Sequence, residues 1–538
     1  MTEFPPPADE NTPEAVAKPK RNAFTRFLDG VEWLGNLLPH PVTLFALLAV
    51  GIVLLSGLFG WMGVAVVDPR PAGAPGVADD GMIRAVSLMN VKGLQRIFTG
   101  LVDNFTSFAP LGVVLVAMLG VGVAEKSGLL SAAVRSLVLG APPKLVTVAI
   151  VFAGIISNTA SEVGYVVLIP LGGAIYYALG RHPLAGMAAA FAGVSGGYSA
   201  NLLIGTIDPL LAGITEEAAQ LIDPDYTVLA TANWYFMVAS TFLITAIGSL
   251  VSIYIVEPQL GKFDASKADP EILDEGMMQP LQSEEKKGLR WAGIAMLGVF
   301  ALMALTLWPE WGVLRNLETG ERMDSPFFDG FVVWILIFFV CVGYAYGRAA
   351  KTMKTDRDVI DAMSGALSSL GLYIVLVFFA AQFVAFFGWT HLGGITAVTG
   401  AQFLKDTGMT GPAMFFAFIG ICALINLSLG SASAQWAVTA PIFVPMLMLI
   451  GYSPEAIQAA YRIGDSTTNI ITPMMSYFGL ILAWATRYQK DLGVGTLIAM
   501  MLPYSICFFI VWSIFFYLWT FALGLPVGPG SPTYYPAA

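Results

Sequence analysis

The sequence predicts an all-α integral membrane protein with nine transmembrane helices, two re-entrant helical hairpins and an inverted-topology repeat. Its composition, the spacing of its apolar runs and a match of the chain with itself predict this fold. Of 538 residues, 56% are hydrophobic and 12% are charged, with a mean hydropathy of +0.72. A soluble domain would be about one quarter charged. Apolar runs recur from 42 to 523, so we expect a single membrane domain over 25–538.

Nine stretches are long and apolar enough to cross a bilayer, which takes about 20 helical residues. They are 41–63, 108–124, 184–206, 234–257, 290–309, 330–348, 368–390, 455–482 and 495–522. Residues 1–24 are polar and rich in proline, so we expect them to form a disordered cytoplasmic tail.

Four further apolar stretches come as two pairs, at 145–179 and at 411–450. The first pair is joined at 157–162 by Ser-Asn-Thr-Ala-Ser-Glu, and the second at 428–433 by Ser-Leu-Gly-Ser-Ala-Ser. Links this short cannot form a loop in water between two complete spans. We therefore predict two hairpins that enter the membrane and return to the same side.

The distribution of basic residues supports this topology. With the amino terminus inside and both hairpins re-entrant, the inside segments hold 19 of the 27 Lys and Arg residues and the outside segments hold seven. Cytoplasmic loops of membrane proteins carry such an excess. We expect a multi-pass protein of the bacterial inner membrane, with its amino terminus in the cytoplasm and its carboxyl terminus in the periplasm.

The chain contains a match of one segment with a later one. Residues 157–202 align with 428–473 without a gap, with ten identities in 46 positions. The spaced landmarks are a proline, a Gly-x-x-Pro and a Gly-x-Ser, and chance matching of small residues is the alternative explanation. The two copies have opposite orientations in the predicted topology. Secondary transporters built from such inverted repeats bind solutes at broken helices near the midplane.

Each hairpin is followed by a helix whose centre is polar and rich in helix breakers, at 193–209 and at 462–473. Non-helical backbone at membrane depth persists only where protein or a wet cavity satisfies it. Its free N–H groups suit a carboxylate. Its carbonyl and hydroxyl oxygens suit a hard cation such as Na⁺.

Arg462 and Asp465 are the charged residues of the second break. They lie three residues apart and therefore share a helix face. A charge at the centre of a spanning helix costs about 2.5–3.5 kcal/mol on insertion scales, so it is rarely idle. One interpretation is a substrate-carboxylate ligand beside a proton or ion site, and the other is an internal ion pair that holds helices together. Asp465 could titrate in a dry pocket, because desolvation favours its neutral form.

Three other residues have two interpretations each. Asp208 ends its predicted span before Pro209, and either lines the pathway or caps the next segment. Glu162 in the first tip is either a coupling acid or a cap on the returning arm. Trp436 matches Tyr165 in the repeat, so one aromatic residue follows each tip. Trp436 either stacks on an aromatic ring of the substrate or packs in the core.

Several function classes lack support in the sequence. The net charge of −10 is not a nucleic-acid signal, and the three cysteines lie within apolar runs without transition-metal or disulfide spacing. There is no phosphate-binding lysine motif of an ATP-driven pump, and no nucleophile–base constellation. We expect no cofactor, no nucleic-acid partner and no enzyme activity. The alternatives to a transporter are a passive anion channel and an intramembrane hydrolase that would use Asp208 and Asp465.

Four stretches resemble the p-aminobenzoyl-glutamate transporter (AbgT) family. They are 33–41, 157–165, 205–211 and 433–469, and the likeness extends over nearly the whole chain from about residue 25. The last stretch is the most specific, with Ser-Ala-Gln-Trp at its start and Arg-Ile-Gly-Asp-Ser-Thr-Thr-Asn at its end. The resemblance implies a fold similar to the divalent-anion/sodium symporters of the ion-transporter superfamily, assembled as a homodimer.

The resemblance also implies a function and a site. We expect secondary active transport of p-aminobenzoyl-glutamate or related aromatic carboxylates, coupled to H⁺ or Na⁺, with export of sulfonamide antimetabolites by some members. The family's pathway residues correspond to Asp208, Ser433, Trp436, Pro454, Arg462, Asp465 and Pro473. Hairpin-tip and break residues that could hold Na⁺ are Ser157, Asn158, Thr159, Glu162, Gly193, Asn201, Ser428 and Asn469. Related symporters use Ser-Asn-Thr tips, a pattern that the first tip keeps and the second does not.

Overall fold

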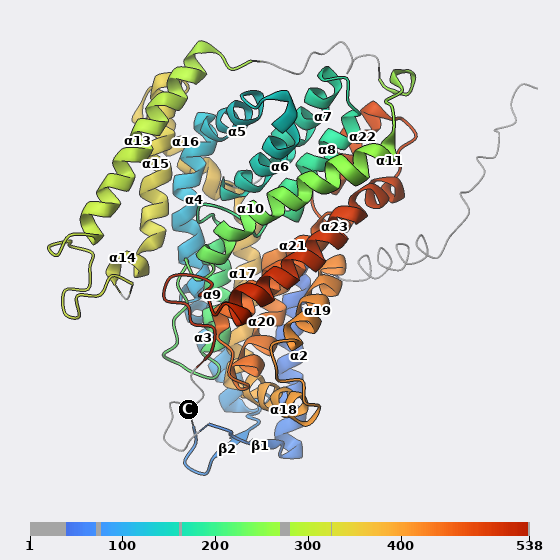
Figure 1. The fold of residues 1–538 in the computed structure, drawn as a ribbon. Helices are drawn as coiled ribbons and strands as arrows, with labels where there is room; N and C mark the ends of the chain where they lie inside the picture. Colours follow the sequence, from blue (N-terminus) through green and yellow to red (C-terminus); the bar gives the residue numbers. More distant parts are fainter. Residues whose placement is uncertain (1–38, 71–76, 161–163, 270–279, 324, 536–538) are drawn as a thin grey trace, which may run out of the picture.

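The computed structural model describes residues 39–70, 77–160, 164–269, 280–323 and 325–535. The predicted tail, 1–24, and Glu162 lie outside these residues. Within the described part the chain forms a bundle of helices, with a small two-stranded sheet at one end (Figure 1).

Seven helical stretches of the described residues are long and apolar enough to cross a membrane, and they match seven of the nine predicted spans. The predicted span 108–124 belongs to a longer stretch, because the chain is already helical from Val91. The helices are α2 (Pro41–Met62), α3 and α4 (Val91–Thr106 and Ala109–Ser127), α10 and α11 (Trp234–Val251 and Glu257–Leu260), α13 (Ser283–Leu307), α15 (Phe331–Ala350), α17 (Gly371–Trp389) and α23 (Val494–Tyr517).

Both predicted hairpins are present as pairs of short helices that turn back on themselves. The first is α6 and α7 (Val146–Ser157 and Ile169–Ala178), and the second is α19 and α20 (Met414–Leu429 and Ala432–Met448). Thr147 Oγ1 lies 2.5 Å from the Tyr176 hydroxyl across the first hairpin, and Gln435 donates to the Cys422 carbonyl at 2.7 Å across the second. The first hairpin lies toward the end of the bundle where α7 is labelled, and the second lies in the other half, where α19 and α20 are labelled (Figure 1).

The other two predicted spans, 184–206 and 455–482, are broken helices. The first consists of α8 (Pro183–Phe191), a wider helical turn to Gly196 and an irregular segment of turns and bends before α9 (Ile207–Ala219). The second consists of α21 (Pro454–Asn469) and α22 (Phe478–Tyr488). The prediction that Asp208 ends a span is wrong, because Asp208 lies in the first turn of α9. Pro209 follows it in that turn, where a missing N–H costs no hydrogen bond.

The repeat is visible in the packing of two glycines that the alignment of 157–202 with 428–473 matches, Gly193 and Gly464. Gly193 lies against the Val151 backbone on α6, where an added Cβ would come within 3.1 Å of the carbonyl carbon. Gly464 lies against α19, where an added Cβ would come within 2.6 Å of Cys422 Cβ and of the Ile419 carbonyl oxygen. Val151 and Cys422 are also matched when the same alignment is extended toward the amino terminus. The matched glycines therefore mark the same helix crossing in both copies.

Several short elements were not predicted, because they lie in segments interpreted as connections. Helix α5 meets the α6 segment at a bend of 113°. Strands β1 and β2 pair antiparallel, with Val66 opposite Ile83. These elements are α5 (Leu129–Leu139), α14 (Pro326–Asp329), α16 (Asp356–Ser369), α18 (Leu392–Asp406), β1 (Ala65–Val67) and β2 (Met82–Arg84).

We expect Gly464→Ala to destabilise the protein, because the new methyl group overlaps the α19 backbone. Overpacking of this kind costs about 1–3 kcal/mol. The matched control is Gly479→Ala in α22, where an added Cβ meets no described atom within 4 Å. Thermal unfolding in detergent measures both variants. Equal midpoints for Gly464→Ala and Gly479→Ala would contradict the close crossing.

Candidate functional site

The tips of both hairpins and both breaks meet at one cavity of about 300 Å³. Asn158 of the first tip and Gly430–Ser433 of the second line it, together with Thr206 and Asn469 from the breaks. A second, larger chamber of about 580 Å³ shares Tyr373, Gly430, Ser431, Ser433 and Ser476 with the cavity and extends to His40 and Ser369. The shared residues make the two spaces neighbours.

Side-chain amides of the hairpins hold the backbone near each break. Asn158 donates to the Val194 carbonyl at 2.8 Å, and Asn426 donates to the Asp465 carbonyl at 2.7 Å. Val194 and Asp465 are matched positions of the repeat, so the two copies use the same acceptor position. Thr472 adds a hydrogen bond to the Leu427 carbonyl at 2.7 Å. These hydrogen bonds tie each hairpin to the helix beside its break, at a depth where backbone polar groups need protein partners.

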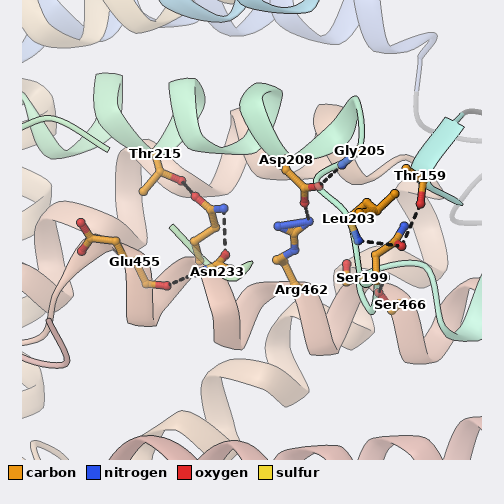
Figure 2. Close-up of polar contacts among 12 residues, drawn as sticks. Thr159, Ser199, Leu203, Gly205, Asp208, Thr215, Asn233, Glu455, Arg462 and Ser466 are labelled. Carbon is orange, nitrogen blue, oxygen red and sulfur yellow. Dashed lines mark hydrogen bonds and ion pairs between the residues drawn. The ribbon is translucent and has the colours of Figure 1, made fainter. Parts of the chain in front are cut away.

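Asp208 and Arg462 form an ion pair between α9 and α21 (Figure 2). Their side chains are only 2% and 3% exposed. The Gly205 backbone N–H also donates to Asp208 at 2.6 Å, so the carboxylate closes the turn that begins α9. An internal ion pair that holds helices together was one interpretation of Arg462, and Arg462 forms such a pair, but its partner Asp208 is 254 residues away and was not predicted.

Asp465 is buried without an ionic partner among the described residues. Neither of its carboxylate oxygens makes a hydrogen bond of standard geometry with that part of the chain. Asn426 Oδ1 and Gln435 Oε1 are likewise buried without a hydrogen-bond partner there. Asn426 already contacts the Asp465 backbone, and Gln435 donates to Cys422, which faces Gly464 beside Asp465. Buried oxygens without a hydrogen-bond donor can accept a proton or coordinate a hard cation such as Na⁺.

Trp436 does not line the described cavity. Its side chain is fully buried, its ring stacks on Tyr461 at 4.2 Å between centroids, and its N–H donates to Thr215 at 2.8 Å. The core-packing interpretation therefore describes Trp436 in this conformation. Tyr461 in turn donates to the Ala432 carbonyl at 2.5 Å, at the start of α20.

A chain of hydrogen bonds runs from Thr215 to polar residues of α21 and was not predicted (Figure 2). Thr215 donates to Gln458 at 2.6 Å, and Gln458 donates to Asn233 at 2.9 Å. Asn233 then donates to the Glu455 carbonyl at 2.9 Å. The signal was present in the sequence, because Glu455, Gln458, Arg462, Asp465 and Asn469 recur at helical spacing and share much of one face.

The remaining predicted residues occupy different parts of the site. Ser433 lines the cavity and Ser428 the wider chamber. Thr159 donates to Asn201 at 2.8 Å, and Ser157 donates to the Gly154 carbonyl at 2.7 Å. The first tip is therefore held by one hydrogen bond to the first break and one within the hairpin. Pro454 is the first residue of α21, and Pro473 lies in the break that follows it.

Groups of three or more His, Cys, Asp and Glu side chains that could hold a metal ion are absent from the described residues. Oxygen atoms of amides, hydroxyls and Asp465 are the available ligands near the site. These suit Na⁺ better than a transition metal.

Two hairpins and two broken helices that meet at one cavity define a class of protein, the membrane transporters built from inverted repeats. The family model described as "AbgT putative transporter family" matches residues 26–535. The chain therefore belongs to the AbgT family of transporters.

Three known proteins show how similar this chain is to its relatives. The p-aminobenzoyl-glutamate transport protein of Escherichia coli is 36% identical over 500 residues, which cover 93% of this chain and 95% of that protein. The YdaH transporter structure of Alcanivorax borkumensis is 45% identical, with a TM-score of 0.84, and covers 91% of this chain and 100% of its own. The MtrF structure of Neisseria gonorrhoeae, described as illuminating a class of antimetabolite efflux pumps, is 59% identical, with a TM-score of 0.89. The match covers 94% of this chain and 100% of the MtrF chain.

We expect Asp208→Asn and Arg462→Gln each to destabilise the fold by about 3–5 kcal/mol, because each leaves one buried charge uncompensated. The double variant should regain most of that loss, since both charges are then removed. Thermal unfolding in detergent measures all three.

Arg84→Gln is the control, because it breaks an ion pair with Asp80 in which both side chains are more than half exposed. Such surface pairs contribute little to stability, because water and salt screen them. A double variant that loses the full sum of the two single losses would contradict the pairing.

Proposed function

We propose that this transporter moves p-aminobenzoyl-glutamate or related aromatic carboxylates by secondary active transport. The observation that carries the proposal is the cavity at the junction of both tips and both breaks, lined by apolar, aromatic, hydroxyl and amide side chains. The similarity to the p-aminobenzoyl-glutamate transport protein supports this solute class. Paired hairpins with internal breaks favour a carrier over a passive anion channel, which needs neither.

The start of α20 is the proposed carboxylate subsite. Ser431, Ala432 and Ser433 line the cavity, and α20 extends 17 residues away from it. The first-turn N–H groups of a helix have no intrahelical partner, and the helix dipole favours an anion there. Ser433 and Ser431 add hydroxyl donors beside these N–H groups. Arg462 is engaged by Asp208 in this conformation, so the carboxylate is held by neutral groups.

Coupling is assigned to Asp465, by H⁺ or by Na⁺. Its buried carboxylate has neither an ionic partner nor a hydrogen bond of standard geometry within the described residues, whereas buried Glu455 accepts from the Tyr226 hydroxyl and Asp208 is neutralised by Arg462. Protonation would remove a buried charge, and Na⁺ would find the Asp465, Asn426 and Gln435 oxygens as ligands.

Export of sulfonamide antimetabolites is the second candidate function. The observation that favours it is the 59% identity to MtrF, whose structure is described in terms of antimetabolite efflux pumps. Sulfonamides and p-aminobenzoyl-glutamate share an aminobenzene ring, so one aromatic cavity could serve both.

We also propose a homodimer in the bacterial inner membrane, with the amino terminus in the cytoplasm and the carboxyl terminus in the periplasm. The excess of Lys and Arg in the predicted inside segments supports the orientation. The family resemblance supports the dimer.

We expect proteoliposomes to accumulate labelled p-aminobenzoyl-glutamate when a pH gradient or a Na⁺ gradient is imposed, and the effective gradient identifies the coupling ion. Asp465→Asn should abolish gradient-driven accumulation, because the amide neither titrates nor carries a charge to bind Na⁺. This substitution preserves size and breaks no ion pair within the described residues, which makes it a cleaner test than a substitution of Arg462.

Asp491→Asn is the control, because Asp491 is an exposed acid outside the site. Undiminished accumulation by Asp465→Asn would contradict the coupling role. A lack of accumulation by the wild-type protein under either gradient, with sulfonamide export against an opposing gradient, would favour the second candidate.

A further inference from the structure

Four tyrosines line the cavity, and they come from four segments of the chain. Tyr165 follows the first hairpin tip, Tyr198 and Tyr477 lie in the two breaks, and Tyr373 is on α17. Tyr165 and Tyr477 stack in parallel, with 4.6 Å between ring centroids and 8° between ring planes. This stacked pair therefore joins the first copy of the repeat to the second directly at the cavity.

The two rings of this pair differ in their burial. Tyr165 is only 7% exposed, whereas Tyr477 is partly exposed, and both line the cavity. Tyr165 supports one face of Tyr477. A ring fixed in this way presents an aromatic surface at low entropic cost, and aromatic partners prefer offset-stacked or edge-on contacts with it.

The tyrosine pair lies in the same cavity as the start of α20. Ser431 and Ser433 from that helix start share the lining with Tyr165 and Tyr477. The volume of about 300 Å³ falls at the lower end of the range of about 300–1,000 Å³ for small-molecule pockets. The cavity thus offers an aromatic surface and an anion-binding helix start, which match the aromatic ring and the carboxylate of a benzoyl-amino acid.

We infer that Tyr477, supported by Tyr165, is the residue that recognises the substrate's aromatic ring, and that Trp436 is a positioning residue. This inference rests on the proposed function, because it names the part of that same site which selects aromatic over aliphatic acyl groups. Trp436 is fully buried, and its ring stacks on Tyr461, whose hydroxyl donates to the Ala432 carbonyl at the start of α20. It therefore acts on the carboxylate subsite through α20.

The test compares two ligands that differ in the ring. Benzoyl-glutamate and acetyl-glutamate carry the same two carboxylates and the same amide, but only the first has a ring. Isothermal titration of the detergent-purified full-length protein gives a Kd for each. Their ratio measures ring discrimination separately from carboxylate binding and from any general loss of affinity.

Tyr477→Leu should reduce this ratio by roughly threefold to tenfold, since an aromatic pair contributes about 0.5–1.5 kcal/mol and 1.4 kcal/mol corresponds to a factor of ten. Tyr477→Phe should keep the ratio, because it retains the ring. Trp436→Phe should weaken both ligands alike and leave the ratio unchanged. Tyr344→Leu on α15, outside the cavity, is the control for loss of a tyrosine.

The inference is overturned if Tyr477→Leu leaves the ratio unchanged, if Trp436→Phe alone lowers it, or if the wild-type protein does not prefer benzoyl-glutamate. The same variants in the proteoliposome assay separate this result from the transport proposal. Ring-selective binding without gradient-driven accumulation would contradict the transport proposal and leave the ring assignment intact. Equal accumulation of benzoyl-glutamate and acetyl-glutamate would contradict the ring assignment and leave the transport proposal intact.

Discussion

The structure depends on the requirement that backbone polar groups inside a bilayer find partners within the protein. The two broken helices would violate this requirement if they stood alone. Asn158 and Asn426 donate to the Val194 and Asp465 carbonyls, which lie near the breaks and occupy equivalent positions in the repeat. Because both donors belong to hairpins, each hairpin is tied to the helix beside its break. The cavity therefore arises where the two hairpin–break units meet, and it is a consequence of how the breaks are stabilised.

Length and composition predicted the spans and hairpins, because these features are local in the sequence. The pair of Asp208 and Arg462 could not be predicted, since it joins residues 254 positions apart. The α9 helix was missed because Pro209 was interpreted as a stop, although proline equally suits a first helical turn. The polar row from Glu455 to Asn469 was available from helical spacing. Its partners on α9 and α10 were not, because nothing local specifies which helix faces that row.

The charges of the site are separated from its cavity. Asp208 and Arg462 neutralise one another between α9 and α21, and neither lines the cavity. The lining instead offers hydroxyls, amides, helix N–H groups and tyrosine rings. A carboxylated solute in this conformation therefore meets dipoles, which bind an anion without holding it as firmly as an unpaired Arg would. A carrier must release its solute, and a lining of dipoles favours release.

The two copies of the repeat share a fold but not an environment. Tyr165 and Trp436 are equivalent by sequence, yet Tyr165 lines the cavity and Trp436 is buried against Tyr461. The tips differ as well, since Thr159 donates to Asn201 while Gly430 adopts a left-handed conformation against the Met474 backbone. Identical environments would place the cavity symmetrically between the two ends of the bundle. Unequal environments on equivalent scaffolds fit the secondary transport proposed above, because a carrier that opens to one side at a time needs a cavity that favours that side.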